Sequence, residues 1–230
     1  MDVQSKIEAL RRTSTFSGIS DDNLSELAGL CMPRTYHHDQ LLWYQGDPGD
    51  YLVVITRGLV KVTVTSDNGD EMVLITLGPH ELVGELSLVD RGPRSASVVA
   101  LKETQCLVIP RTAMIDLMQR RPELVDPLLK ALGVMVRRLT EQAIDLVFLD
   151  LTARVAKLLA REAGHRLADS DATIAVKLGL TQTEIAQMVG ATRPAVNRAV
   201  QVLVARGLIA VQGRKIIIRD LAGLLRRASR

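Results

Sequence analysis

The sequence predicts an α+β fold in which an N-terminal, jelly-roll-like β-barrel is followed by a long helix and a smaller C-terminal helical domain. Three features of the 230 residues support this prediction. Apolar and polar residues alternate in short runs between Leu41 and about Pro110, as they do in strands with one buried face. The apolar period becomes helical after Arg121-Pro122, and basic residues gather at the C-terminal end. A chain of this length suits two compact domains.

The barrel region contains one clear hairpin. Apolar residues alternate with Lys61, Thr63 and Thr65, and the turn sequence Ser66-Asp67-Asn68-Gly69-Asp70 separates them from a second run at 72–77. This pattern predicts two antiparallel strands. Other turns are marked by the sequence Gly46-Asp47-Pro48-Gly49-Asp50 and by four single glycines, Gly58, Gly78, Gly84 and Gly92.

A long helix is expected at about 122–150. Seven residues spaced alternately four and three positions apart share one of its faces: Leu128, Leu132, Met135, Leu139, Gln142, Leu146 and Leu149. Strict spacing of this kind over three heptads is typical of a coiled coil, so we expect this helix to join two copies of the chain. The alternative is a helix that packs on the core of its own chain, for which a wider apolar stripe is usual.

Shorter elements follow the long helix. A second helix is expected at about 152–163, with Gly164 as its end. A short strand then opens the C-terminal domain, because three apolar residues alternate with other residues there: Ile174, Val176 and Leu178. Two further strands, at 208–211 and 215–219, flank the turn Gln212-Gly213-Arg214 and should form a wing.

Between these strands the sequence predicts two helices joined by a tight turn. Thr181 and Glu184 form a capping box that starts the first helix, and Gly190 ends it. Thr192 can cap the second helix. The apolar residues of the second helix lie on one stripe: Val196, Val200, Leu203 and Val204. Its polar residues face outward: Arg193, Asn197 and Arg198. Two such helices form a helix-turn-helix, and with the wing they indicate binding of double-stranded DNA.

The charge distribution supports DNA binding. The formal net charge is +3, but residues 191–230 hold nine basic side chains and one acidic side chain. Arg193 lies in the first helical turn and can reach O6 and N7 of a guanine, and Arg198 can reach another base or a phosphate. The candidate DNA-binding residues are Thr181, Gln182, Thr192, Arg193, Pro194, Asn197, Arg198 and, at the wing tip, Arg214 and Lys215. Each of them alone would more simply be a solvated surface residue.

A second group of residues has the chemistry of a phosphate site. Gly84-Glu85-Leu86-Ser87 is followed by Arg94-Ser95-Ala96. The missing side chain of Gly84 lets backbone amides approach an anion, a short helix starting there offers unpaired N–H groups, and Arg94 adds a charged fork. Glu85 would accept a hydrogen bond from a sugar hydroxyl. The alternative is a turn that carries a surface Glu–Arg pair.

These residues, together with the turn at 46–50, resemble the cyclic AMP receptor protein and fumarate-nitrate regulator family of bacterial transcription regulators. Phe148-Leu149-Asp150 and the segment 180–198 are similar to the hinge and the helix-turn-helix of that family. The resemblance implies a cyclic-nucleotide-binding sensor domain at 1–121, a dimerisation helix at 122–150 and a winged helix-turn-helix at 151–230. It also implies cyclic AMP as an allosteric ligand with no other cofactor, and double-stranded DNA, a second copy of the chain and RNA polymerase as partners.

The resemblance assigns roles to particular residues of the sensor domain. Ribose and cyclic phosphate would be held by Gly84, Glu85, Leu86, Ser87, Arg94 and Ser95, while Leu139 and Thr140 would face the adenine. The sequence departs from the family at two of its sites. Leu139 replaces a residue that is usually polar, which leaves one side-chain donor for the base. Pro194 stands where many members have an acidic residue, so the operator is expected to differ at one base pair.

The remaining composition argues against other classes of protein. No apolar run approaches the roughly 20 residues of a membrane span, and the N-terminal residues lack a signal peptide, so a cytoplasmic protein is expected. Cys31 and Cys106 stand far apart and are expected to be buried thiols, and the four histidines show no metal-ligand spacing. We see no catalytic constellation and expect no enzyme. The alternatives are a regulator of the same fold that senses another ligand or none, and a metal-dependent β-barrel enzyme with a DNA-binding appendage.

Overall fold

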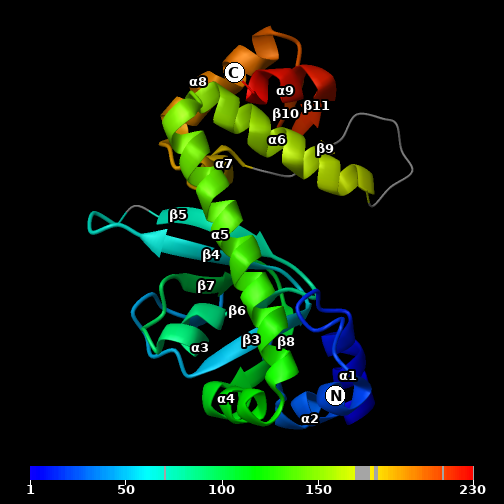
Figure 1. Ribbon diagram of the computed structural model, residues 1–230. Helices are drawn as coiled ribbons and strands as arrows, with labels where there is room; N and C mark the ends of the chain where they lie inside the picture. Colours follow the sequence, from blue (N-terminus) through cyan, green and yellow to red (C-terminus); the bar gives the residue numbers. More distant parts are fainter. Residues whose placement is uncertain (70, 169–176, 179–180, 214, 230) are drawn as a thin grey trace. The chain divides into compact units, whose positions relative to one another are not determined.

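The computed structural model describes residues 1–69, 71–168, 177–178, 181–213 and 215–229. The chain forms two compact units, Met1–Arg137 and Arg138–Arg230 (Figure 1). Helix α5 (Val125–Phe148) contains the boundary between them. Each unit has its own core, so each is described by itself.

The first unit contains two four-stranded antiparallel sheets. One sheet has the order β1-β8-β3-β6, formed by Met32–Tyr36, Thr104–Pro110, Tyr51–Arg57 and Leu82–Val83. The other has the order β2-β7-β4-β5, formed by Leu41–Trp43, Ser97–Ala100, Val60–Thr65 and Glu71–Leu77. The predicted jelly-roll-like arrangement is therefore confirmed, although the described strands form two separate sheets and not a closed barrel. The predicted hairpin is also confirmed, because β4 and β5 pair from Val60↔Leu77 to Thr65↔Glu71.

Strand β3 supplies both cores of this unit. Leu52 and Val54 face a cluster formed with the helices, and Val53 and Ile55 face a second cluster between the sheets. All four side chains are fully buried, which explains why this strand is an uninterrupted apolar run and does not alternate. The helices of the first unit are α1 (Val3–Arg11), α2 (Asp21–Leu30), α3 (Glu85–Asp90), α4 (Arg111–Arg120) and a 3-10 turn at Pro122–Leu124.

The long helix is present and starts within the first unit. Leu128 is buried against the helical cluster of that unit, whereas several later apolar residues of α5 are 41% to 75% exposed in the single chain: Val134, Leu139, Ile144, Leu146, Val147 and Phe148. An apolar helix of one chain with this much exposed surface is unusual for a monomer.

The second unit combines helices with a three-stranded sheet. Its helices are α6 (Leu151–Ala168), α7 (Gln182–Val189), α8 (Arg193–Ala205) and α9 (Leu221–Ala228), and its strands β10 (Ile209–Gln212), β11 (Lys215–Ile218) and β9 (Lys177–Leu178) pair in that order. Helices α6 to α9 and strands β10 and β11 share one apolar core. Helix α9 was not predicted from the sequence.

The predicted helix end at Gly164 is wrong, because α6 continues to Ala168. A glycine inside a helix costs only about 1 kcal/mol, and the packing of buried residues such as Leu159 and Ala163 outweighs that cost. Leu178 of the predicted short strand pairs with Ile216, while Ile174 and Val176 lie outside the described residues.

We expect Gly58→Ala to destabilise the first unit strongly. Gly58 has φ +108°, and a Cβ atom there would lie 2.5 Å from Thr104 Cα and 2.7 Å from the carbonyl oxygen of Glu103. The free energy of unfolding should fall by about 1–3 kcal/mol, measured by urea denaturation. Gly29→Ala is the matched control, because α2 leaves open space there and Ala favours a helix. Equal effects of the two substitutions would contradict the strain at Gly58.

Candidate ligand cradle and DNA-binding surface

The residues predicted to form a phosphate cradle lie where β6 passes into α3. Gly84 adopts φ +94° and is the N-cap of α3. Arg94 returns to the same place from the loop after α3, and its Nη1 donates to the carbonyl oxygen of Gly84 at 3.3 Å. A Cβ atom on residue 84 would lie 2.6 Å from Arg94 Nη1. Glycine is therefore required at position 84 both by its backbone conformation and by the approach of Arg94.

Arg94 is held in an aromatic cage. Its side chain is buried, with 2% of the residue exposed, and its guanidinium lies 3.9 Å from the ring centroid of Trp43 and 4.7 Å from that of Tyr51. Its Nη2 donates to the carbonyl oxygen of Tyr51 at 2.5 Å. Trp43 and Tyr51 meet edge to face, and each donates a hydrogen bond to a backbone carbonyl. The cage therefore fixes the direction of a guanidinium that keeps its charge although burial lowers its pKa.

Two polar atoms at the cradle are buried without a hydrogen-bond partner among the described residues: Glu85 Oε2 and Arg94 Nε. Burial raises the pKa of the Glu85 carboxyl, and its own backbone amide and the charge of Arg94 oppose that shift. A buried acceptor and a buried donor without partners are costly unless something else satisfies them. A ligand that brings a hydroxyl to Glu85 and an anionic oxygen to Arg94 would satisfy both.

The other predicted ligand residues are spread more widely. Ser87 is buried on α3 and packs so closely on Gly49 that a Cβ atom at position 49 would collide with it, while Leu86 is half-buried. Ser95 is exposed beside Arg94. Leu139 and Thr140 lie beyond Arg137 on α5, within the second unit, and both are exposed in the single chain.

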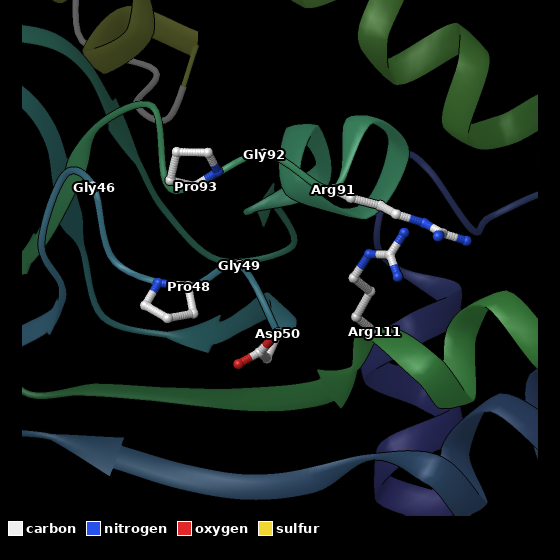
Figure 2. A pocket seen from close by; sticks show the side chains of 8 residues that line it. All are labelled: Gly46, Pro48, Gly49, Asp50, Arg91, Gly92, Pro93 and Arg111. Carbon is white, nitrogen blue, oxygen red and sulfur yellow. The ribbon is translucent and has the colours of Figure 1, made fainter.

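A pocket of about 370 Å³ lies between the Gly46–Asp50 turn and the loop after α3 (Figure 2). Its lining residues are Gly46, Pro48, Gly49, Asp50, Arg91, Gly92, Pro93 and Arg111, and none of them is a predicted ligand residue. The two loops are joined because Gly46 N donates to Arg94 O and Arg94 N donates to Asp47 O, each at 2.8 Å. The turn at 46–50 thus holds the backbone of Arg94 in place through these two hydrogen bonds.

The helix-turn-helix is built as the sequence predicts. Thr181 Oγ1 accepts from Glu184 N at 3.2 Å, and Thr181 N donates to Glu184 Oε2 at 2.6 Å, which completes the capping box. Gly190 ends α7 with φ +62°. Helices α7 and α8 then bury apolar residues against each other: Ile185, Ala186 and Val189 with Val196, Val200 and Leu203.

The predicted DNA-reading side chains of α8 all face solvent: Arg193, Pro194, Asn197 and Arg198 are exposed. Thr192 is the N-cap of α8, but its side chain makes no capping hydrogen bond, and Pro194 at the second helical position has no N–H to offer it. In the wing, Gln212 pairs with Lys215, and Lys215 is exposed. Arg214 lies outside the described residues.

Two arginines that the sequence analysis did not identify hold this unit together. Arg154 on α6 donates from Nη1 to the carbonyl oxygen of Val189, at the end of α7, at 2.8 Å. Arg227 on α9 pairs with Asp150 at 2.5 Å, while Asp150 also accepts from Ala153 N at 2.8 Å and so caps α6. The amide of Ala153 and the charge of Arg227 hold the pKa of Asp150 below its ordinary value.

Chemistry outside these two sites is limited in the part of the chain that the structure describes. Cys31 and Cys106 are buried, which confirms the prediction, and burial raises their pKa values to about 12 and about 11. Thiols with such pKa values are unreactive. Among the described residues, no group of histidine, cysteine and carboxylate side chains is arranged to hold a metal ion. No described helix has the length and apolar composition needed to cross a bilayer.

Comparison with known proteins defines the class of this protein. Residues 33–121 match the cyclic nucleotide-binding domain, and residues 153–227 match the Crp-like helix-turn-helix domain. The protein is therefore a DNA-binding transcription regulator with a cyclic nucleotide-binding domain. Both domains are those of transcription regulators.

Individual relatives identify the family. The chain is 34% identical over 221 residues to the CRP-like cAMP-activated global transcriptional regulator of Mycobacterium tuberculosis. The alignment covers 96% of this chain and 99% of the relative. It is 30% identical over 216 residues to the cyclic AMP receptor protein of Thermus thermophilus, and this alignment covers 93% of this chain and 95% of that relative. The solved structure of the c-di-GMP responsive global regulator CLP of Xanthomonas campestris has the same fold, with a TM-score of 0.77 at 22% identity over 86% of this chain and 99% of that one. This chain belongs to the CRP/FNR family of transcription regulators.

The ion pair between Asp150 and Arg227 should stabilise the second unit in a pH-dependent way. Asp150→Asn removes the charge but keeps a good N-cap, and Arg227→Met removes the partner charge. A double-mutant cycle at pH 7 should give a coupling of about 0.5–1 kcal/mol in the free energy of unfolding, because Asp150 is largely exposed. Folding lowers the pKa of this carboxyl, so its charge stabilises the folded state fully at pH values above the unfolded pKa of about 3.9. The coupling should therefore vanish as the pH falls through the pKa of the folded state. A coupling that persists at about pH 2 would assign the effect to packing of Arg227 and not to its charge.

Proposed function

We propose that the protein is a cyclic-AMP-gated transcription regulator that binds a palindromic operator as a homodimer. The observation that carries the proposal is a pair of buried atoms that have no hydrogen-bond partner in the described part of the chain, Glu85 Oε2 and Arg94 Nε, beside the backbone of Gly84. The names of the M. tuberculosis and T. thermophilus relatives, which state cyclic AMP, support the choice of ligand. The three-part division at 1–121, 122–150 and 151–230 is part of this proposal.

In the proposed complex, the ribose and the cyclic phosphate occupy the cradle. A ribose hydroxyl donates to Glu85, and the phosphate takes hydrogen bonds from Arg94 and from backbone amides at the start of α3, with Leu86, Ser87 and Ser95 around it. Leu139 and Thr140 on α5 face the base. A phosphate would compete with the two carbonyl oxygens that Arg94 now contacts, so ligand binding would alter the contacts of a buried group.

A second candidate is a regulator of the same family that senses a different ligand. Leu139 removes one of the two polar groups expected near the base. The Xanthomonas neighbour is named for its response to c-di-GMP, which indicates that this fold also suits other nucleotides. Titration with cyclic AMP, cyclic GMP and c-di-GMP separates the two candidates.

The homodimer is proposed on the apolar face of α5. Residues of the 4-3 pattern and their neighbours expose large apolar side chains in the single chain, including Leu139 at 41% and Leu146 at 47%. Burial of such surface between two parallel helices is favourable by about 25 cal/mol per Å². A helix with the same 4-3 spacing of apolar residues can cover this face along its whole length, and a second copy of the chain supplies such a helix.

The second unit would present α8 to the major groove. Arg193, Asn197 and Arg198 would reach base edges, while Lys215 and Arg214 would contact phosphates. Thr181, Gln182, Thr192 and Pro194 would lie at the helix starts beside them. Two-fold symmetry requires half-sites about 34 Å apart. A regulator of this kind acts with RNA polymerase, and it works on the chromosome, so we expect it in the bacterial cytoplasm.

We expect Arg94→Ala to lower the affinity for cyclic AMP at least tenfold, because the charge-assisted contacts to a phosphate in a partly buried site are worth about 2–5 kcal/mol. Calorimetry with cyclic AMP measures this loss. Arg91→Ala removes the same charge from an exposed position in the adjoining loop and should leave the affinity unchanged. If Arg94→Ala binds as tightly as the native protein, the cradle is not the ligand site.

The proposed interface makes a separate prediction. Replacing Leu132 and Leu139 with Asp should give monomers, because two negative charges per chain would meet across a dry seam. Light scattering of the purified protein measures the mass. Exposed Leu129 lies on α5 outside the 4-3 pattern, so Leu129→Asp should still give dimers. A dimer that survives the double substitution would show that the copies associate elsewhere.

A further inference from the structure

We propose that Gln182 and Asn197 form one base-reading pair, in which Gln182 orients Asn197 toward the major-groove edge of an adenine. Gln182 Nε2 donates to Asn197 Oδ1 at 3.1 Å. This hydrogen bond joins the first residue of α7 to the exposed face of α8, so it connects the two helices at the surface proposed for DNA. The inference rests on the proposed DNA binding and gives Gln182 a specific role in it.

The backbone positions of the pair are fixed before any DNA arrives. The capping box of Thr181 and Glu184 fixes the first turn of α7, where Gln182 lies. The buried contact between α7 and α8 sets the distance between the helices, and Arg154 holds the far end of α7 through the carbonyl oxygen of Val189. The short side chain of Asn197 has few rotamers left to fix, and the hydrogen bond from Gln182 selects among them.

The hydrogen bond also decides what Asn197 can still recognise. An amide oxygen has two lone pairs, and Gln182 uses one of them. Asn197 therefore keeps one acceptor position on Oδ1 and the two donors of Nδ2. The remaining acceptor position can accept from the N6 amino group of adenine, and Nδ2 can donate to adenine N7. This is the bidentate contact that asparagine makes with adenine in the major groove. Thymine and cytosine do not offer a donor beside an acceptor, and guanine offers two acceptors, so none of the three matches both groups of Asn197.

The position of Asn197 predicts where the adenine lies. Asn197 follows Arg193 by four residues, so the two side chains share one stripe of α8 and stand about 6 Å apart along the helix axis. Base pairs rise by about 3.4 Å. The adenine should therefore lie within two base pairs of the guanine that Arg193 reads.

The test begins with selection of duplexes from a randomised pool by the full-length protein, with and without cyclic AMP. Each position of the selected half-site is then replaced, and affinities are measured for the native protein, Arg193→Ala and Asn197→Ala. At one G·C pair the Arg193→Ala variant should no longer distinguish between bases. We expect an A·T pair within two positions of that G·C pair. Replacing this adenine with 7-deazaadenine removes N7, and it should weaken the native protein about tenfold but leave Asn197→Ala unaffected. The modified duplex tests the native protein and does not depend on the folding of a variant.

Gln182→Met tests the orienting role, because methionine has a similar volume and no donor. It should lower the preference for adenine several-fold while general DNA affinity and the salt dependence stay the same. Gln187→Met, the same substitution on another face of α7, should leave the preference unchanged. If Gln182→Met weakens all duplexes equally and reduces the salt dependence, Gln182 contacts a phosphate and the inference is wrong.

The remaining outcomes separate this inference from the proposed function. If no duplex is enriched, DNA binding itself fails, and the inference fails with it. If duplexes are enriched and depend on Arg193, but show no adenine that Asn197 reads, only the inference is overturned.

Discussion

The packing of the Arg94 guanidinium between Trp43 and Tyr51 is the constraint on which the first unit, Met1–Arg137, depends. A buried charge is costly unless its surroundings compensate for it, and here two ring faces and two backbone carbonyls do so. The carbonyls belong to Gly84, directly after β6, and to Tyr51, the first residue of β3, so one side chain joins the start of α3 to the first sheet. The same side chain still has one donor without a partner among the described residues.

This arrangement explains several features around it. Gly84 must be glycine because Arg94 approaches it, and Gly49 must be glycine because Ser87 packs against it. The loops on both sides are joined by the backbone of Arg94 itself. Arg111 adds a further constraint, since it donates to the carbonyl oxygens of Ser87 and Leu88 at 3.0 Å each and so holds α3 in place. The surroundings of Arg94 are therefore built in advance of ligand.

Much of the architecture could be predicted from the sequence, because its signals are local. Alternation reveals the β4–β5 hairpin, and the capping box reveals α7. The residues that were missed act over long distances in sequence. Trp43 lies 51 positions before Arg94, and Arg227 lies 77 positions after Asp150, a separation at which no periodicity connects them. Gly164 was misread because a local helix-ending signal was outweighed by tertiary packing that the sequence does not display.

The contact between α9 and Asp150 affects the order in which the protein matures during synthesis. Domains usually fold as units while the chain emerges, N-terminal parts first. The first unit has all the buried residues of its core once Leu128 has been made, whereas the second unit lacks the Asp150 partner and the buried Leu224 until α9 has been translated. A nascent chain can therefore hold a complete core of the first unit while its DNA-reading unit is still incomplete.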